Sequence, residues 1–398
     1  MGLSDVVKAE RMHIAIFGKR NAGKSSLINA LSGQPIALVS DVKGTTTDPV
    51  EKTMELLPLG PVVLIDTPGF DDEGTLGEQR VARAMEVLNK TDIALLVAQG
   101  QALDAQEIAF LQKLEQRKVP VIVVFNKADT LTEMPTPKEN EIFVSALTGL
   151  GIQQLKEKLG ALNIEKQERF VVADLLDERD TVILVTPIDA AAPKGRIILP
   201  QQQTLREILD AKCSAIVCQP EQLSATLANL KQPPKLVITD SQVFEAVDRI
   251  LPPDIALTSF SILFARYKGD LDTLVRGVKA LGALQEGDRV LISEGCTHHR
   301  QCGDIGTQKL PRWIEDFIGA KLQFEFTSGG NFPDDMTPYQ LVVHCGGCML
   351  TQTQMEDRLE RARKESVPMV NYGIAIAYMK GILPRALKPF PQTLSLLI

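Results

Sequence analysis

Short apolar runs, separated by polar and glycine-containing segments, recur along this chain. In the first 165 residues these runs have the length of buried strands. The predicted strands of this part cover residues 13–17, 50–57, 62–65, 93–98, 119–125 and 142–144. After the first of them and an eight-residue segment, Ser26–Leu31 has the pattern of the opening turns of a helix. The polar segments between these elements are therefore predicted to be loops at strand ends.

The middle of the chain alternates between strand-like and helix-like segments. Strands are predicted over residues 181–185, 196–199, 214–218, 235–239 and 255–259. Helices are predicted over residues 202–212, 220–230 and 241–250, and two later strands over residues 289–292 and 340–343. The pattern predicts two smaller α/β domains after the first one. We place the three domains at residues 1–165, 166–268 and 269–398.

The composition is that of a globular protein with sizeable cores. Of 398 residues, 44% are hydrophobic and 23% are charged, and this length predicts two or three domains. The net charge of −7 gives no electrostatic reason to expect a nucleic-acid partner. No window approaches the ~18 apolar residues that span a bilayer, and the N-terminal segment lacks the apolar core of a secretory signal. We therefore expect a cytoplasmic protein with no membrane or nucleic-acid partner, whose cysteines stay reduced.

The segment Gly18–Ser25 lies between the first predicted strand and the first predicted helix. Glycines such as Gly18 and Gly23 let backbone N–H groups turn towards an anion, and the helix N-terminus adds a positive dipole. Lys24 is then placed to reach the β- and γ-phosphates of a nucleotide, and Ser25 to bind Mg²⁺. Strand, loop and helix together are the context of a phosphate-binding loop.

Four later segments complete a predicted site for GTP or GDP. A hydroxyl of Thr46 can complete the Mg²⁺ shell, Asp66 suits its outer shell, and the Gly69 N–H can meet the γ-phosphate. Asp129 can accept the two adjacent hydrogen bonds that guanine offers and adenine does not. The remaining predicted nucleotide-binding residues are Ser26, Asn126, Lys127, Ser145 and Ala146.

Taken together, these motifs resemble the G domains of the tRNA-modification (TrmE-like) and Era-like GTPases. The resemblance implies GTP hydrolysis and a parallel sheet with helices on both faces. Phe70 stands where Ras-like proteins have a water-orienting glutamine, so side-chain positioning of the water by that residue is not available here. Glu73, in the acidic segment that follows, could orient the attacking water instead; the alternative is a solvated acidic loop.

The same resemblance extends to a monovalent cation. In TrmE-like proteins an asparagine of the phosphate-binding loop helps to hold a K⁺ ion that supplies positive charge, and Asn21 matches that position. The resemblance therefore implies hydrolysis that K⁺ stimulates more than Na⁺, with Lys24, Thr46 and Gly69 as the other catalytic residues. The alternative is that Asn21 only caps the loop.

Two predicted strands of the last domain run into loops that contain cysteine and histidine. The first loop carries Cys296 and His298, and the second carries His344, Cys345 and Cys348. Loops beyond the carboxyl ends of parallel strands converge on one crevice. Three cysteines and an exchangeable fourth position suit a [4Fe–4S] cluster, with either histidine as the fourth or a nearby ligand. A closed zinc site, a redox pair and ordinary reduced thiols are the alternatives.

The combination of G domain, α/β domain and cysteine loops resembles the HydF family of [FeFe]-hydrogenase maturation GTPases over essentially the whole chain. The resemblance implies a homodimer formed through the middle domain and a [4Fe–4S] cluster on Cys296, Cys345 and Cys348. It also implies a scaffold that receives a transient di-iron subcluster precursor, made with radical-SAM hydrogenase maturases, and delivers it to apo-[FeFe]-hydrogenase. The competing interpretation is a TrmE-like RNA-modification or regulatory GTPase with a structural zinc site.

Overall fold

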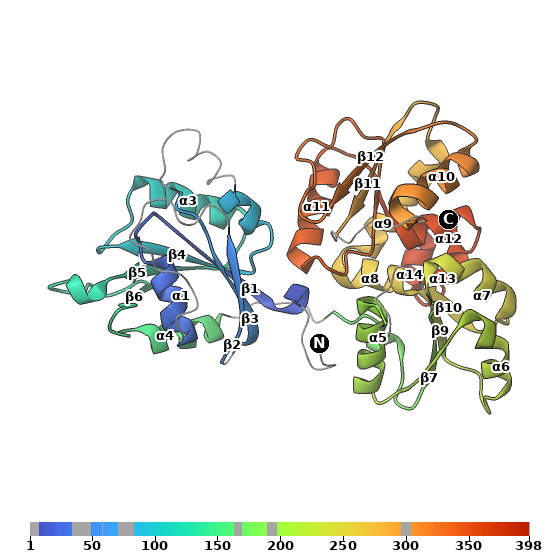
Figure 1. Ribbon diagram of the computed structural model, residues 1–398, viewed down its shortest axis with the longest axis horizontal. Coiled ribbons are helices and arrows are strands. Elements are labelled where there is room, and N and C mark those ends of the chain that lie inside the picture. The colour runs from blue at the N-terminus through green and yellow to red at the C-terminus, as the bar shows by residue number, and fades with distance from the viewer. Residues whose placement is uncertain are drawn as a thin grey trace. The chain divides into compact units, whose positions relative to one another are not determined.

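The computed structural model describes residues 8–33, 49–57, 59–70, 83–162, 169–188, 197–295 and 304–397. Four residues of the predicted sites, Thr46, Glu73, Cys296 and His298, lie outside these ranges. The chain divides into two compact units, residues 1–166 and 167–398, whose helices and strands are drawn in Figure 1.

A six-stranded sheet forms the centre of the first unit, in the order β2-β3-β1-β4-β5-β6. The strands are β1 (Met12–Gly18), β2 (Val50–Leu56), β3 (Gly60–Asp66), β4 (Ile93–Gln99), β5 (Val121–Asn126) and β6 (Glu141–Phe143). Strand β2 is antiparallel to β3, and the other neighbouring strands are parallel. Strands β1 and β4 are buried along almost their whole length, which accounts for their continuous apolar sequence. The predicted strands of this part are confirmed.

Helices cover both faces of this sheet. On one face, α1 (Lys24–Ser32) and α4 (Ile152–Ala161) contribute Leu27 and Leu155 to a buried core. On the other face, α3 (Ala105–Gln116) contributes Phe110 and Leu114, together with residues from the helical segment 83–88. The arrangement confirms the predicted fold class for the first part of the chain.

Two four-stranded parallel sheets form the second unit. The first has the order β10-β9-β7-β8, with β7 (Thr181–Val185), β8 (Ser214–Cys218), β9 (Leu236–Thr239) and β10 (Ala256–Ser259). The second has the order β12-β11-β13-β14, with β11 (Arg289–Glu294), β12 (Gln323–Ser328), β13 (Leu341–His344) and β14 (Met369–Asn371). One cluster of buried hydrophobic side chains extends through both sheets. This confirms that α/β structure follows the first domain.

The helices of the second unit pack around these two sheets. Their bounds are α5 (Leu199–Asp210), α6 (Leu223–Ala228), α7 (Phe244–Ile250), α8 (Phe260–Lys268), α9 (Leu271–Gly277), α10 (Leu310–Ile318), α11 (Gln352–Lys364), α12 (Tyr372–Met379), α13 (Leu383–Ala386) and α14 (Pro391–Leu394). Within the described ranges, none of the helices has the length and apolar character needed to cross a membrane.

The structure corrects one predicted element. The strand predicted over residues 196–199 is wrong, because Ile197 and Ile198 have irregular backbone and Leu199 already begins α5. Pro200 occupies the second position of this helix, where a backbone N–H has no partner within the helix in any case. The β-branched isoleucines favour a strand locally, but the proline marks the start of a helix.

Candidate functional site

The phosphate-binding loop connects the end of β1 to the start of α1 at Lys24. A Cβ atom on Gly18 would lie 2.3 Å from the Val97 carbonyl oxygen of β4. Gly23 has a φ of 91°, and a Cβ atom there would lie 2.2 Å from Asn126 Nδ2 of β5. Side chains other than hydrogen are therefore excluded at both positions by the neighbouring strands, and at Gly23 also by the backbone conformation.

The side chains of Ser25 and Asp66 are hydrogen-bonded to each other, and the charge of Lys24 acts on Asp66. The Ser25 hydroxyl donates a hydrogen bond to Asp66 Oδ2 at 2.6 Å. Buried Lys24 donates from Nζ to the carbonyl oxygens of Gly18 and Lys19 at 2.9 and 2.8 Å. Burial raises the pKa of Asp66, although the Ser25 hydroxyl and the Lys24 charge act in the opposite direction. A hydroxyl beside a carboxylate suits Mg²⁺, and the adjacent ammonium group suits phosphate.

Asn126 ties the phosphate-binding loop to the two predicted base-binding loops. Its Nδ2 donates to the Ala22 carbonyl oxygen at 3.0 Å, and its Oδ1 accepts from the Ala146 N–H at 3.0 Å. Lys127 follows with a φ of 63°, and Asp129 is exposed in the next turn. The structure thus places the carboxylate that is predicted to recognise guanine at the surface, where a purine can reach it.

The other predicted nucleotide-binding residues are placed as follows. Gly69 lies in irregular chain after β3, and Ser26 is half-buried on α1. Ser145 is fully buried, and its Oγ accepts a hydrogen bond from the Thr148 N–H at 3.2 Å. The roles of these residues, and that of Thr46, stay predictions.

Two residues to which the sequence analysis gave no role hold this site together. Gln99, at the end of β4, donates from Nε2 to the Asn21 carbonyl oxygen at 2.5 Å. Thr67 donates from Oγ1 to a carbonyl oxygen of β1 at 2.8 Å. Neither residue stands out in the sequence, because each acts through a partner distant along the chain.

Phe70 is packed into the first unit. Its ring stacks on that of Phe110 in α3, with the ring centroids 4.5 Å apart and the planes 6° from parallel. A phenyl ring has no group that could hydrogen-bond water. The position that orients water in Ras-like proteins therefore serves packing here.

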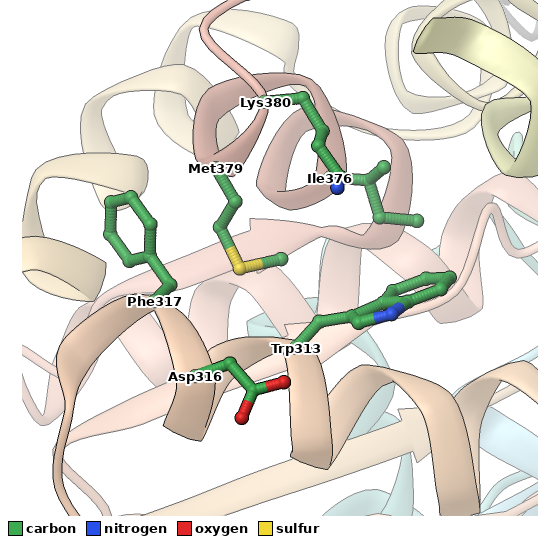
Figure 2. A pocket seen from close by; sticks show the side chains of 6 residues that line it. All are labelled: Trp313, Asp316, Phe317, Ile376, Met379 and Lys380. Atoms are coloured by element: carbon green, nitrogen blue, oxygen red, sulfur yellow. The ribbon is translucent and has the colours of Figure 1, made fainter. Parts of the chain in front are cut away.

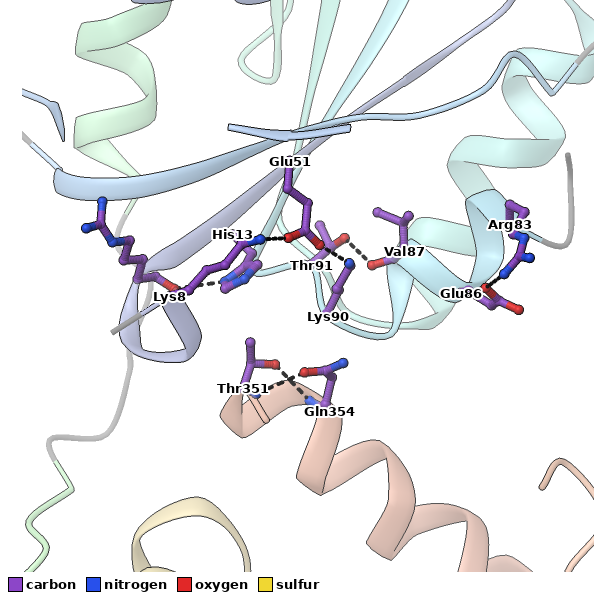
Figure 3. A network of polar contacts seen from close by, with 11 residues as sticks. Lys8, His13, Glu51, Arg83, Glu86, Val87, Lys90, Thr91, Thr351 and Gln354 are labelled. Carbon is purple, nitrogen blue, oxygen red and sulfur yellow. Dashed lines mark hydrogen bonds and ion pairs between the residues drawn. The ribbon is translucent and has the colours of Figure 1, made fainter. Parts of the chain in front are cut away.

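Glu51 on β2 connects two basic side chains (Figure 3). It forms ion pairs with Lys8 near the N-terminus and with Lys90, which follows the helical segment 83–88. Burial raises the pKa of Glu51, but the hydrogen bonds and charges of the two lysines outweigh it and lower the pKa to about 2. The group ties β2 to Lys8 and to the end of the helical segment 83–88.

We expect a Glu51→Gln variant to be less stable than the wild-type protein at neutral pH by roughly 1 kcal/mol, because partly exposed ion pairs contribute modestly. The pKa of Glu51 in the folded protein lies below its ordinary value of 4.5. The stabilisation is therefore present above that value and is lost as the pH falls towards 2. Denaturant unfolding at neutral pH and near pH 3 measures this change. A difference between the two proteins that does not shrink in acid would contradict it.

The loop of residues 345–348, here called the cysteine loop, follows β13 at the point where β11 and β13 end side by side. Cys345 directly follows β13, and its N–H donates to the Ser293 carbonyl oxygen at 3.0 Å. The Cys345 sulfur accepts hydrogen bonds from the Gly295 N–H at 3.0 Å and from the Gly347 N–H at 3.4 Å. Hydrogen bonds of this kind favour a thiolate over a thiol. The sulfur is therefore held in place by the backbone of two loops.

The donor chemistry of this loop fits a metal centre, but the described residues do not complete one. Burial raises the pKa of Cys345 and of Cys348, the latter to about 11, so both thiols need a nearby cation to ionise at neutral pH. Across the described ranges, no group of three or more histidine, cysteine, aspartate or glutamate side chains could hold a metal ion. Cys296 and His298, which would have to contribute, lie outside those ranges.

His344 is fully buried, and both of its ring nitrogens have partners. Its Nε2 lies 2.8 Å from Arg358 Nη1, and its Nδ1 lies 2.7 Å from the Cys345 carbonyl oxygen. A guanidinium group can only donate, so Nε2 accepts and the Nδ1–H donates to the carbonyl. Burial lowers the pKa of His344 to about 3, which keeps the ring neutral. In this conformation neither nitrogen is left for a metal, although the sequence marked His344 as a candidate ligand.

A groove of about 250 Å³ lies between α10 and α12, apart from the cysteine loop. Figure 2 shows the six side chains that line it, Trp313, Asp316, Phe317, Ile376, Met379 and Lys380. Among the described residues that line the groove there is no cysteine or histidine. His344, Cys345 and Cys348 therefore do not line this groove.

Three family models match successive parts of the chain. Residues 13–127 match a model described as a 50S ribosome-binding GTPase. Residues 171–269 match the hydrogen maturase F dimerization domain, and residues 272–389 match the hydrogen maturase F tetramerization domain. The first match includes the phosphate-binding loop, and the last includes Cys345 and Cys348.

The sequence matches to curated relatives cover about two fifths of the chain. The tRNA modification GTPases MnmE of Bordetella avium and Legionella pneumophila are 35% and 36% identical to it over 159 and 156 residues. These matches cover 39% and 38% of this chain but only 34% of each relative. GTPase Der of Kosmotoga olearia is 35% identical over 192 residues, which are 43% of this chain and 40% of Der. The chain thus spans about a third of the length of these MnmE relatives.

Solved structures that resemble the chain include other GTPases. The G domain of the T. maritima FeoB iron transporter matches with a TM-score of 0.30 and 24% identity, over 38% of this chain and 98% of that domain. Aquifex aeolicus Era bound to GDP and AlF₄⁻ matches with a TM-score of 0.33 and 16% identity, over 80% of this chain and 92% of Era. Scores this low say nothing about what the chain does.

Proposed function

The chain belongs to the hydrogen maturase F family, and from this premise we propose that it is a GTPase that acts in [FeFe]-hydrogenase maturation in the cytoplasm. In this proposal, residues 1–165 bind and hydrolyse GTP, residues 166–268 form a homodimer, and residues 269–398 hold a [4Fe–4S] cluster. The protein receives the di-iron subcluster precursor from radical-SAM maturases and delivers it to apo-hydrogenase.

The geometry of the phosphate-binding loop supports the GTPase part. Both carbonyl partners of Lys24 belong to the phosphate-binding loop. A nucleotide bound in this loop would therefore replace them with phosphate oxygens. Ser25 would bind Mg²⁺, with Asp66 in the outer shell of the ion, and the ion would neutralise charge on the phosphate oxygens. Asn126 fixes the phosphate-binding loop relative to the base-binding loops. Asp129 can then bind the guanine while Lys24 binds the phosphates.

The observation that carries the maturation part is the pair Cys345 and Cys348 in the loop after β13, beside the carboxyl end of β11. The GTPase motifs alone do not separate this proposal from a tRNA-modification GTPase, because the MnmE relatives share that part of the chain. Cys345 and Cys348 instead lie in the matched tetramerization domain, with the Cys345 sulfur hydrogen-bonded by two backbone N–H groups. Hydrogen bonds to thiolate sulfur are a means by which proteins tune iron–sulfur clusters.

The proposal is tested by anaerobic reconstitution of the full chain with iron and sulfide, followed by UV-visible absorption and EPR. We expect about four irons per chain and an EPR signal in the reduced state. Tight binding of zinc with no cluster would favour the competing proposal, a GTPase with a structural zinc site. An RNA-binding assay on the same sample then separates an RNA-modification GTPase from a regulatory one.

The oligomeric part of the proposal rests on the first sheet of the second unit. The residues of this sheet match the hydrogen maturase F dimerization domain. Strand β8 lies at the edge of the sheet among the described strands, and Val217 on it is 44% exposed. An edge strand offers unpaired backbone groups to a second copy. Light scattering on the full chain measures whether it forms a dimer or a larger assembly.

GTP would act by timing the exchange of partners. Hydrolysis releases loops that depend on the γ-phosphate, so the nucleotide state can change which surfaces meet the maturases and the apo-hydrogenase. Binding of a purified maturase to the GTP-bound and GDP-bound protein tests this proposal. Equal affinities and equal rates in the two states would contradict it.

We expect GTP hydrolysis to be faster in K⁺ than in Na⁺ by roughly 10- to 100-fold, because a cation held by Asn21 supplies charge that Phe70 cannot. An Asn21→Ala variant should lose most of this difference. Gln99 holds the backbone carbonyl of Asn21 rather than its side chain, but Asn21 has a φ of 61°, which alanine adopts at a cost, so GDP affinity and thermal unfolding of the variant are measured as controls for the loop conformation. Phosphate release measured in the two salts at equal ionic strength checks the prediction. Equal wild-type rates in both salts would instead support the capping role.

A further inference from the structure

A buried arginine donates hydrogen bonds to His344 and Ser293, the two residues that hydrogen-bond to the backbone of Cys345. Arg358, on α11, is 3% exposed. Its Nη1 donates to His344 Nε2 at 2.8 Å and to Ser293 Oγ at 3.3 Å, and its Nη2 donates to the Gly329 carbonyl oxygen. Its guanidinium carbon lies 4.9 Å from the centre of the Phe332 ring. Each of these partners is uncharged.

In the ranges that the structure describes, no carboxylate forms an ion pair with this cation, although the charge of Asp357 on the same helix favours it. The nearest carboxylate in sequence, Asp357, pairs at 2.8 Å with Arg361, one turn further along the same helix. Arg361 also pairs with Asp334 at 2.5 Å. Burying a charge without a counter-charge is costly even when its hydrogen bonds are satisfied. The present contacts of Arg358 therefore leave its buried positive charge without a carboxylate ion pair in the described ranges.

The contacts of Arg358 lead to Cys345 by two short routes. His344 accepts from Arg358 and donates to the Cys345 carbonyl oxygen. Ser293 accepts from Arg358 through Oγ, while its own carbonyl oxygen accepts from the Cys345 N–H. The arginine therefore fixes both residues that hold the backbone of Cys345. Burial lowers the pKa of Arg358 to about 10, while the charges of Cys345 and Asp357 favour its cationic form and that of Arg361 opposes it.

We propose that Arg358 is a positioning residue for the metal centre and that its missing anion is supplied by the thiolates of Cys345 and Cys348 when they bind metal. The inference rests on the metal-binding role proposed for these cysteines. A thiolate pair in a buried loop needs positive charge besides that of the metal, and a guanidinium group keeps its charge when buried. Arg358 also stabilises a reduced centre over an oxidised one, because reduction adds negative charge next to it.

Three variants separate charge from packing. Arg358→Gln removes the charge, Arg358→Lys keeps it without the forked hydrogen bonds, and Arg361→Gln removes a cation of the same helix that already has carboxylate partners. Each full-length protein is reconstituted with iron and sulfide, and the midpoint potential is measured by EPR-monitored redox titration. Iron release to a chelator is timed on the same samples, and the proteins are unfolded thermally with and without metal.

We expect Arg358→Gln to shift the midpoint potential to more negative values and to release iron roughly ten times faster, in line with the loss of one partner of a buried charge pair. Its metal-free form should lose less stability than its metal-bound form, because the hydrogen bonds to His344, Ser293 and Gly329 are lost in both forms and the charge pair only in the second. Arg358→Lys should stay near the wild-type potential, and Arg361→Gln should match it. An unchanged potential in Arg358→Gln, or an equal loss of stability with and without metal, would overturn the proposal.

A parallel zinc titration distinguishes a failure of the proposal for Arg358 from a failure of the proposed function. If the wild-type protein takes up no cluster, the scaffold proposal fails, but Zn²⁺ still recruits the same thiolates. Arg358→Gln should then bind Zn²⁺ more weakly than wild type, while Arg361→Gln should not. Equal zinc affinities for all three proteins would overturn the role of Arg358 in that case as well.

Discussion

Replacing Lys24 with alanine should lower kcat/KM for GTP hydrolysis by roughly 100- to 1,000-fold, the range for loss of one preorganised donor at a developing charge. Lys24 is buried, and its ammonium group already faces the inside of the phosphate-binding loop, where it bonds the carbonyl oxygens of Gly18 and Lys19. The ammonium group is therefore already inside the loop and only has to exchange these carbonyl partners for phosphate oxygens. The loss should appear in GDP affinity as well, because Lys24 also contacts the β-phosphate.

The measurements for this variant are phosphate release and titration with a fluorescent GDP analogue. Lys113→Ala is the matched control, because it removes an exposed lysine of α3 in the same unit. Thermal unfolding shows whether the Lys24 variant still folds, since its side chain bonds the loop even without nucleotide. A folded Lys24→Ala protein that hydrolyses GTP at the control rate would contradict the assigned phosphate site.

Replacing Cys348 with serine should reduce the iron content from about four atoms per chain to a small fraction of one, with loss of the reduced-state EPR signal. Serine keeps the size of the side chain but is a poor ligand for iron, and two remaining cysteines cannot hold the cluster alone. GTP hydrolysis should stay near the wild-type rate, because the G-domain motifs belong to the other compact unit.

Cys213→Ser provides the control for loss of a buried thiol. The Cys213 sulfur donates to the Asp177 carbonyl oxygen at 3.1 Å, and a serine hydroxyl can make the same bond. This variant should keep its iron. Full iron incorporation in Cys348→Ser would remove Cys348 from the proposed ligands, and loss of iron in Cys213→Ser as well would point to general misfolding instead.

The order of strands and loops could be predicted from the sequence because the signals are local. Buried parallel strands produce continuous apolar runs, and a phosphate-binding loop needs glycine where neighbouring strands leave no room, as at Gly18 and Gly23. The strand predicted over residues 196–199 failed for the same reason, since its isoleucines and Pro200 give opposing local signals. Cysteines at the ends of two predicted strands could likewise be expected to lie near one edge of a sheet, and Cys345 does follow β13 beside β11.

The tertiary structure decided how these residues are held, because their partners are distant along the chain. Asn126 bridges two loops, and Gln99 holds the loop of Asn21. No local sequence pattern indicates either contact. His344 is the clearest case. Its position next to Cys345 marks it as a candidate ligand, but burial and the donated bond from Arg358 engage its free nitrogen. The sequence by itself determined which chemical groups reach each site, whereas only packing between distant segments decided which of them stay available to a ligand.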